Sequence, residues 1–365
     1  MKIASAASAF PKHYYSQKAL LERLQDYWGA ELKNPLLLAR LHRNVTVDGR
    51  YLAIPAEEYV DIKTWGQAND IWIRVAQELG EQALCRALHN AGLKTQDLGA
   101  LLFTTVTGVA SPSIDGMLIN RMGLPPKIRR TPIFGLGCVA GAAGIARASD
   151  YVQAYPKQAA ALVSVELCSL TLQREDLSVA NLISSGLFAD GAAAVIVTGD
   201  EFETSSDAEM DGGRTNGTKM NGPRIVATRS IFYPATEDMM GWNISEKGFR
   251  IILSTEVPKL IRENLGRDVD DFLADHGHRR SDLKSWVLHT GGPKVLDASA
   301  DALGLHNGEL DASWACLKKV GNLSSASVLC VLEDVMKNRR PAPGTLGLLA
   351  AMGPGFCSEL LLLQW

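Results

Sequence analysis

The sequence has no paired-cysteine pattern. Its six cysteines lie far apart, and no Cys-x-x-Cys or histidine-rich spacing occurs among its 365 residues. Short spacings of this kind mark disulfide frameworks and zinc sites, so neither is expected. The cysteine usage favours a reducing compartment, and we expect a cytoplasmic protein without a metal centre.

Long hydrophobic runs and an excess of one charge are also lacking. No apolar segment approaches the length of a membrane span. Residues 1–7 are apolar but few, and they predict a first strand rather than a signal peptide. The 37 Lys and Arg residues against 40 Asp and Glu residues give a formal net charge of −3. Because the basic residues are also scattered, the composition argues against a nucleic-acid partner.

The chain alternates between short apolar runs and helical periodicities, which predicts α/β layers with a buried sheet. The predicted strands lie at 101–107, 159–165, 192–197, 224–231, 286–289, 346–351 and 360–365. The predicted helices lie at 17–43, 70–93, 176–188, 246–265 and 323–337. Asp190 and Gly191 predict a turn. Residues 203–223 are polar and glycine-rich, which predicts a surface loop at the border between two halves, 1–215 and 216–365.

The most informative stretch is GLGCVAGAAGIARAS, at residues 135–149. It follows a strand at 131–134 and predicts a helix that is apolar on nearly every side and therefore buried. Cys138 then lies at the first turn of this helix, where free backbone N–H groups and the helix dipole favour the thiolate. This is a position for a nucleophile, although such a cysteine taken alone is more often a small hydrophobic core residue.

Two polar residues in the second half are candidates to act with Cys138. His289 ends a predicted strand and is followed by glycines, which places it at the rim of the sheet, where it can take the thiol proton. Asn322 precedes a predicted helix, and its amide can donate to a carbonyl oxygen that becomes negative during a reaction. Taken alone, His289 is equally a half-buried structural histidine, and Asn322 is a helix N-cap.

Four motifs together resemble the signatures of type III polyketide synthases, the chalcone-synthase-like family. They are GLGCVAGAAG around Cys138, LHTGGPKVLD around His289, GNLSSASVL around Asn322 and GPGF at 353–356. The segment FADGAA at 188–193 is similar to a further family segment. Order and separations match along essentially the whole chain. The resemblance implies a thiolase-like, five-layer αβαβα fold built from two similar halves, and a homodimer.

The same resemblance implies a reaction. The Cys138 thiolate, kept ionised by His289, takes an acyl group from an acyl-CoA starter. His289 and Asn322 then bond the thioester carbonyl of malonyl-CoA as CO2 leaves, and the carbanion attacks the bound acyl group. Repeated extension by this decarboxylative Claisen condensation precedes cyclisation. The substrates are coenzyme A thioesters, and no metal or redox cofactor is needed.

The resemblance also assigns a substrate pocket and a coenzyme A site. Phe188 matches one family gatekeeper, Ile251 replaces a second gatekeeper Phe, and Trp242 stands where plant enzymes have a small residue. A smaller Ile251 suits an aliphatic chain. Trp242 resembles the bacterial members that make alkylpyrones and alkylresorcinols, whereas the bulk of its ring favours a shorter cavity. The other pocket residues implied are Thr107, Thr171, Gly353, Pro354, Gly355 and Phe356. The residues implied for coenzyme A, each equally readable as solvated surface charge, are Arg40, Arg43, Arg50 and Lys294.

These observations predict a type III polyketide synthase that extends a fatty acyl-CoA with malonyl-CoA to an alkylpyrone or alkylresorcinol. A malonyl-only tetrahydroxynaphthalene-type synthase and a 3-ketoacyl-ACP synthase III-like enzyme, which performs one condensation, are the alternatives closest to it. Two readings of other classes stay open: a cysteine acyl hydrolase, which also uses Cys, His and Asn, and a thiolase-fold protein that binds acyl-CoA without turnover.

Overall fold

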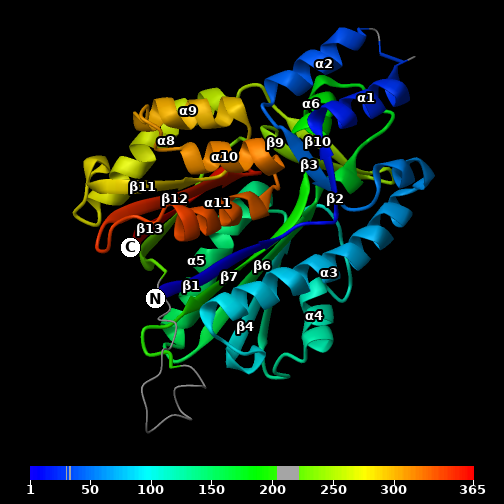
Figure 1. Ribbon diagram of the computed structural model, residues 1–365. Coiled ribbons are helices and arrows are strands. Elements are labelled where there is room, and N and C mark those ends of the chain that lie inside the picture. Colours follow the sequence, from blue (N-terminus) through cyan, green and yellow to red (C-terminus); the bar gives the residue numbers. More distant parts are fainter. Residues whose placement is uncertain (30, 33, 204–221) are drawn as a thin grey trace.

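The computed structural model describes residues 1–29, 31–32, 34–203 and 222–365, and a nine-stranded sheet runs through it (Figure 1). The strand order is β11-β12-β13-β8-β1-β7-β6-β4-β5. In that order the strands are Leu283–Leu288, Leu346–Gly353, Cys357–Gln364, Arg224–Phe232, Lys2–Ala9, Asp190–Thr198, Ala159–Leu167, Leu98–Thr105 and Arg129–Phe134. The strand expected at the N-terminus is confirmed as β1, which pairs with β7 near the middle of the sheet.

The side chains of β7 alternate between two helical layers, as the period of a strand requires. Ala192, Ala194 and Ile196 belong to a core cluster with α3 (Trp65–Ala91). Ala193, Val195 and Val197 belong to a second cluster, which contains α5 (Ala140–Ala154) and α11 (Ser325–Asn338). Both faces of this strand are therefore buried, which explains why its sequence is apolar throughout.

The same alternation recurs in β13, and it places α5 and α11 between two parts of the sheet. Leu361 and Leu363 join the cluster of α5 and α11, whereas Leu360 and Leu362 face α8 (Val257–Ala274) and α9 (Pro293–Leu303). Figure 1 shows the resulting sequence of layers, from α8 and α9 through the sheet and α5 with α11 to the sheet again and α3. The expected five-layer αβαβα fold is confirmed.

Smaller elements cover one end of these layers. They include β2 (His13–Ser16), α1 (Gln17–Trp28), α2 (Pro35–Asn44), β3 (Gly49–Leu52), α6 (Val179–Leu187) and the hairpin β9 (Met240–Ser245) with β10 (Gly248–Leu253). Trp28, Leu38 and Leu182 form a small core that joins α1, α2 and α6. The remaining helices are α4 (Ile114–Met122) and α10 (Asp311–Val320).

Three local predictions are wrong. The helix predicted at 17–43 is two helices, α1 and α2. Residues 246–265 do not form one helix, because 248–253 is strand β10 and α8 begins only at Val257, with a proline in its first turn. The β-branched run around Ile251 pairs with β9 instead. Asp190 and Gly191 do not form a turn but begin β7.

The remaining predictions concern the loop and membrane spans. The predicted border between residues 215 and 216 lies outside the described residues, as does most of the loop predicted at 203–223. In the parts of the chain that the structure describes, no helix is both long and apolar enough to cross a membrane.

Candidate active site

Cys138 lies in a tight bend between β5 and α5. The strand ends at Phe134, a short 3-10 turn covers Gly137–Val139, and α5 begins at Ala140. Gly137 has φ +55°, and a Cβ atom there would lie 2.5 Å from Cδ of Pro354. A side chain is therefore excluded at this position by both backbone and space, and the bend presents Cys138 at the start of the buried helix.

His289 directly follows β11 at the edge of the same region. Its backbone N–H donates to the Ala350 carbonyl of β12 at 3.0 Å, which extends the parallel pairing by one residue. The imidazole is only 4% exposed. Neither ring nitrogen has a hydrogen-bond partner among the described residues. A buried polar ring without partners is costly to a fold and is typical of a group that acts on a ligand.

Asn322 is held by both its backbone and its side chain. Its N–H donates to the Leu187 carbonyl and its C=O accepts from Ala189 N, each at 2.9 Å. Its Oδ1 accepts from Ser324 N at 2.8 Å and from Ser327 Oγ at 3.3 Å. The helix cap itself is Ser324, so Asn322 is not the N-cap of α11. The bonds to Oδ1 fix the amide plane and leave Nδ2 as the free donor.

The three residues line one cavity of about 80 Å³, although they come from distant parts of the chain. The Cys138 thiol donates to Ser324 Oγ at 3.6 Å. No direct hydrogen bond joins Cys138 to His289 among the described contacts. Most of the remaining wall is apolar and includes Met352 and Val106. A thiol, an imidazole and an amide donor around a small apolar cavity can transfer an acyl group and stabilise a developing oxyanion.

The expected low pKa of Cys138 is wrong for this state of the protein. Burial raises the pKa of the Cys138 thiol to about 12, and the hydrogen bond with Ser324 opposes this only in part. Burial also lowers the pKa of His289 to about 4. Loss of water around both groups favours the neutral thiol and the neutral imidazole, which opposes the effect expected from the N-terminus of α5.

Glu166 is a buried carboxylate beside the site, and the sequence did not single it out. Its carboxylate accepts from Val106 N at 3.1 Å, from Thr107 Oγ1 at 2.9 Å and from the Ser325 hydroxyl. Burial raises its pKa to about 7, and its charge raises the pKa of Cys138. A single carboxylate in the otherwise apolar run at 159–167 was the signal available in the sequence.

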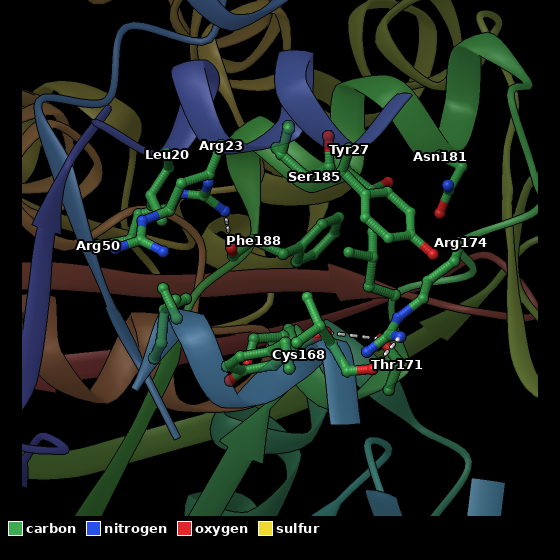
Figure 2. Close-up of a pocket in the computed structure, with 18 of the residues that line it drawn as sticks. Leu20, Arg23, Tyr27, Arg50, Cys168, Thr171, Arg174, Asn181, Ser185 and Phe188 are labelled. Carbon is green, nitrogen blue, oxygen red and sulfur yellow. Dashed lines mark hydrogen bonds between the residues drawn. The ribbon is translucent and has the colours of Figure 1, made fainter. Parts of the chain in front are cut away.

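Phe188, Trp242 and Ile251 form the wall between this cavity and a larger one of about 430 Å³. Trp242 and Ile251 lie directly opposite each other in the β9–β10 hairpin. Thr171 lines the larger cavity, where Figure 2 shows it near Cys168. Pairing across the hairpin thus brings two of the predicted pocket residues to the boundary of both cavities.

The segment at 353–356 closes the other side of the small cavity. Pro354 and Phe356 line it. A Cβ atom on Gly353 would lie 2.5 Å from the Leu136 carbonyl oxygen, so this glycine allows close contact with the Cys138 bend. Gly355 has φ +65°. Thr107 is not among the residues that line either cavity; its hydroxyl donates to Glu166 and accepts from Leu167 N, and its role in the substrate pocket stays a prediction.

The basic residues expected to bind coenzyme A differ in their surroundings. Arg40 and Arg43 are exposed on α2, and Lys294 is exposed in the first turn of α9. Arg50 is buried, and it donates to the Phe188 carbonyl at 2.7 Å and to Gln17 Oε1 at 3.2 Å. Because these contacts hold its guanidinium inside the fold, Arg50 is not a surface phosphate ligand, and the prediction is corrected there.

Family models match nearly the whole chain. Residues 6–201 match the model for the N-terminal domain of chalcone and stilbene synthases, and residues 224–365 match the model for the C-terminal domain. Among the described residues, no group of His, Cys, Asp and Glu side chains has the arrangement of a metal site.

Two relatives and one solved structure match over nearly their full lengths. The chain is 48% identical to a 1,3,6,8-tetrahydroxynaphthalene synthase of Streptomyces peucetius, over 100% of this chain and 93% of that protein. It is 33% identical to a putative chalcone synthase of Bacillus subtilis, over 100% and 98%. The crystal structure of 1,3,6,8-tetrahydroxynaphthalene synthase from Streptomyces coelicolor superimposes with a TM-score of 0.90 at 31% identity, covering 100% of this chain and 99% of that one.

Proposed function

The chain belongs to the chalcone and stilbene synthase family and is a type III polyketide synthase, and from this premise we propose that it builds its product from malonyl-CoA alone. The observation that carries the catalytic part is the convergence of Cys138, His289 and Asn322 on one small cavity. The malonyl starter is supported by the 48% identity to a tetrahydroxynaphthalene synthase and by the bulk of Trp242 beside that cavity.

Acyl transfer begins from a neutral thiol and a neutral imidazole. His289 takes the Cys138 proton as the sulfur attacks the thioester carbonyl of the starter. The C–S bond to coenzyme A breaks, and coenzyme A leaves as a thiol after taking up the proton. The acyl group is then held on Cys138 as a thioester.

Chain extension uses the polar groups that remain. The thioester carbonyl of an incoming malonyl-CoA accepts from Asn322 Nδ2 and from a protonated ring nitrogen of His289. As the C–C bond to the carboxylate breaks and CO2 leaves, negative charge moves to that oxygen and meets fixed donors. The enolate carbon attacks the acyl group on Cys138, a new C–C bond forms, and the sulfur leaves as a thiolate that can be acylated again.

The decisive experiment is to incubate the purified protein with malonyl-CoA as the sole substrate and to identify products by mass spectrometry. We expect CO2 release and an aromatic product that contains only malonyl-derived carbon. No product without a second acyl-CoA would contradict the malonyl starter. A single addition to an acyl carrier protein would indicate a 3-ketoacyl-ACP synthase III-like enzyme, and acyl-CoA consumption without malonyl-CoA would indicate a hydrolase.

A second candidate is the fatty acyl starter with an alkylpyrone or alkylresorcinol product. It is favoured by the cavity of about 430 Å³ behind Phe188, Trp242 and Ile251, whose lining is mainly apolar. A panel of acyl-CoA esters of increasing length, each offered with malonyl-CoA, distinguishes the two. Alkyl-substituted products that exceed the malonyl-only product at equal concentrations would favour the fatty acyl starter.

Coenzyme A binding, assembly and location complete the proposal. Arg43 lines a surface cavity together with Lys18 and Lys318, and these cations suit phosphate groups. Arg40 and Lys294 are the further candidates for this role.

A homodimer, typical of the family, and a cytoplasmic location belong to the same proposal. Light scattering coupled to size-exclusion chromatography tests the dimer, and the salt dependence of KM for malonyl-CoA tests the cationic site.

A further inference from the structure

The larger cavity adjoins the catalytic one. The two share Cys168, Phe188, Trp242 and Ile251 as lining residues. An acyl chain that grows on Cys138 beyond the volume of the small cavity therefore meets this boundary and the space behind it. The residues that line the larger cavity then contact the chemical group at the far end of that chain (Figure 2).

Three arginines line this mainly apolar cavity, and two of them already have partners. Arg50 donates to the Phe188 carbonyl and to Gln17 and lies in the field of the buried Asp190 carboxylate. Arg23 forms an ion pair with Glu57 at 3.6 Å and lies over the ring of Tyr15. Arg50 thus uses its Nε and Nη1 in contacts with the protein, and the charge of Arg23 is balanced by Glu57.

Arg174 is different. Its guanidinium makes one long hydrogen bond, of 3.5 Å, to the Val60 carbonyl and lies 5.7 Å from the ring centroid of Tyr27. It has no carboxylate partner within the described residues; Asp26, exposed on α1 at the rim of the cavity, is not paired with it. Figure 2 shows the Arg174 side chain lying between Tyr27 and Thr171.

An arginine keeps its charge at all ordinary pH values and offers a planar fork of donors that matches a carboxylate. Charge-assisted bonds of this kind gain strength beside apolar surface, where water competes less. A half-buried guanidinium at the wall of an apolar cavity therefore suits a ligand that is apolar along its length and anionic at its end. A neutral alkyl chain would fill the same space and leave the cation unpaired.

We propose that Arg174 is a specificity-determining residue that binds a carboxylate at the far end of the acyl chain held on Cys138. The inference rests on the proposed function, since it concerns the chain carried by the catalytic cysteine. A malonyl starter belongs to this class of acyl group, because its thioester leaves a free carboxylate at the other end. Longer dicarboxylic acyl groups place the same charge deeper in the larger cavity.

Competitive acylation of Cys138 tests the proposal without requiring chain extension. Octanedioyl-CoA and octanoyl-CoA, which have equal carbon number, are offered together, and the two adducts are quantified by intact-protein mass spectrometry. We expect the wild-type protein to prefer the octanedioyl group. Arg174→Gln should lower that preference about tenfold and leave the rate with octanoyl-CoA unchanged, while Arg174→Lys should restore part of it.

Lys63→Gln is the matched control. Lys63 is an exposed cation that donates to the same Val60 carbonyl; it lines a neighbouring outer cavity, which Arg174 also lines, but not the cavity of about 430 Å³. It should leave the preference unchanged. An equal loss of both adducts in Arg174→Gln, or an equal shift in Lys63→Gln, would overturn the proposal. Since acylation is read directly, this outcome is independent of whether malonyl-CoA alone yields a polyketide.

Discussion

At the scale of single residues, the side-chain amide of Asn322 has two roles: its oxygen makes structural hydrogen bonds, and its nitrogen acts on the substrate. Its Oδ1 accepts two bonds from the start of α11, and its Nδ2 faces the reaction in the proposed mechanism. We predict that Asn322→Ala raises the barrier to malonyl-CoA decarboxylation by about 2–4 kcal/mol, the typical effect of removing one oxyanion donor. CO2 release measures this step.

Acylation of Cys138 in the same variant serves as the internal control. Asn322→Asp, which keeps the acceptor for Ser324 and Ser327 but removes the donor, should reproduce the loss of decarboxylation with less disturbance of the helix. Equal losses in acylation and decarboxylation would contradict the assigned role and would indicate that the substitution only damages the start of α11.

Burial of Glu166 makes the free energy of unfolding fall as the pH rises. Its pKa is raised from the ordinary 4.5 to about 7 by burial, so between these values the folded protein keeps a proton that the unfolded chain has lost. Stability contributed by this group is therefore present below about pH 4.5 and is lost as the pH rises to about 7. The full effect is at most about 3 kcal/mol.

Glu166→Gln should remove this slope. The glutamine can still accept from Val106 N and donate to the Ser325 hydroxyl, which keeps most of the network. Urea unfolding of both proteins at several pH values measures the difference, and the subtraction cancels the opposite contribution of buried His42 and His289, whose pKa values are lowered. Parallel pH profiles for the two proteins would contradict the assignment.

The failed expectation for the pKa of Cys138 has a simple cause at this scale. The position of the residue at a helix start can be derived from neighbouring glycines and alanines. The loss of water cannot, because it depends on His289, Phe356 and other wall residues that are remote in sequence. The effect of the helix start on the pKa of Cys138 could be predicted from nearby residues, whereas the larger effect of desolvation depends on the tertiary structure.

At the scale of elements, the 3-10 turn that carries Cys138 depends on Gly137. We predict that Gly137→Ala destabilises the protein by about 1–2 kcal/mol through its left-handed backbone and by about 1–3 kcal/mol more through overlap with Pro354. The same substitution should displace the nucleophile. Thermal unfolding gives the stability loss, and mass-mapped alkylation of Cys138 reports its position.

Gly123→Ala is the control for backbone strain. Gly123 has φ +61° and ends α4, but a Cβ atom there meets no neighbour within 4 Å. It should cost only about 1 kcal/mol and leave acylation of Cys138 unchanged. If the two alanine variants behave alike, contact between the bend and the 353–356 segment is not what fixes the position of the cysteine.

The elements that the sequence predicted correctly are those with strong local patterns. The long helix predicted at 70–93 is confirmed as α3, which ends before Gly92 in a left-handed conformation, and the apolar runs at 159–165 and 192–197 form central strands. The hairpin β9–β10 was missed because its exposed side has no clean alternation. That error concealed the pairing of Trp242 with Ile251, which shapes the boundary of the site.

At the scale of the whole molecule, the positions of the candidate catalytic residues were predictable, whereas the cavities were not. Cys138, His289 and Asn322 are marked by motifs at the ends of elements, and the layered fold brings those ends together. Arg50 looked like a surface cation beside Arg40 and Arg43, yet it is buried. The volume and charge of a cavity depend on many side chains from separate elements, so no short pattern encodes them.

Product size should follow from how the two cavities are divided. Trp242 lies between the cavity of about 80 Å³ and the cavity of about 430 Å³. The centroid of its ring is 5.9 Å from that of Phe249. We predict that Trp242→Ala reduces the boundary between the cavities and shifts the preference from malonyl-CoA alone towards longer acyl-CoA starters, because an alkyl chain gains about 0.8 kcal/mol for each further buried CH2 group. Ratios of kcat/KM across a panel of starters measure the shift.

A substitution that adds volume at Ile251, the residue paired with Trp242, tests the same prediction in the opposite direction. Ile251→Phe adds bulk directly across the hairpin from Trp242 and should reduce any acceptance of long starters while leaving acylation by malonyl-CoA intact. Trp242→Ala also removes a half-buried ring, so thermal unfolding must show that it remains folded at the assay temperature. An unchanged starter preference in a folded Trp242→Ala protein would mean that Phe188 and Ile251 alone separate the cavities, and that the tryptophan only supports the hairpin.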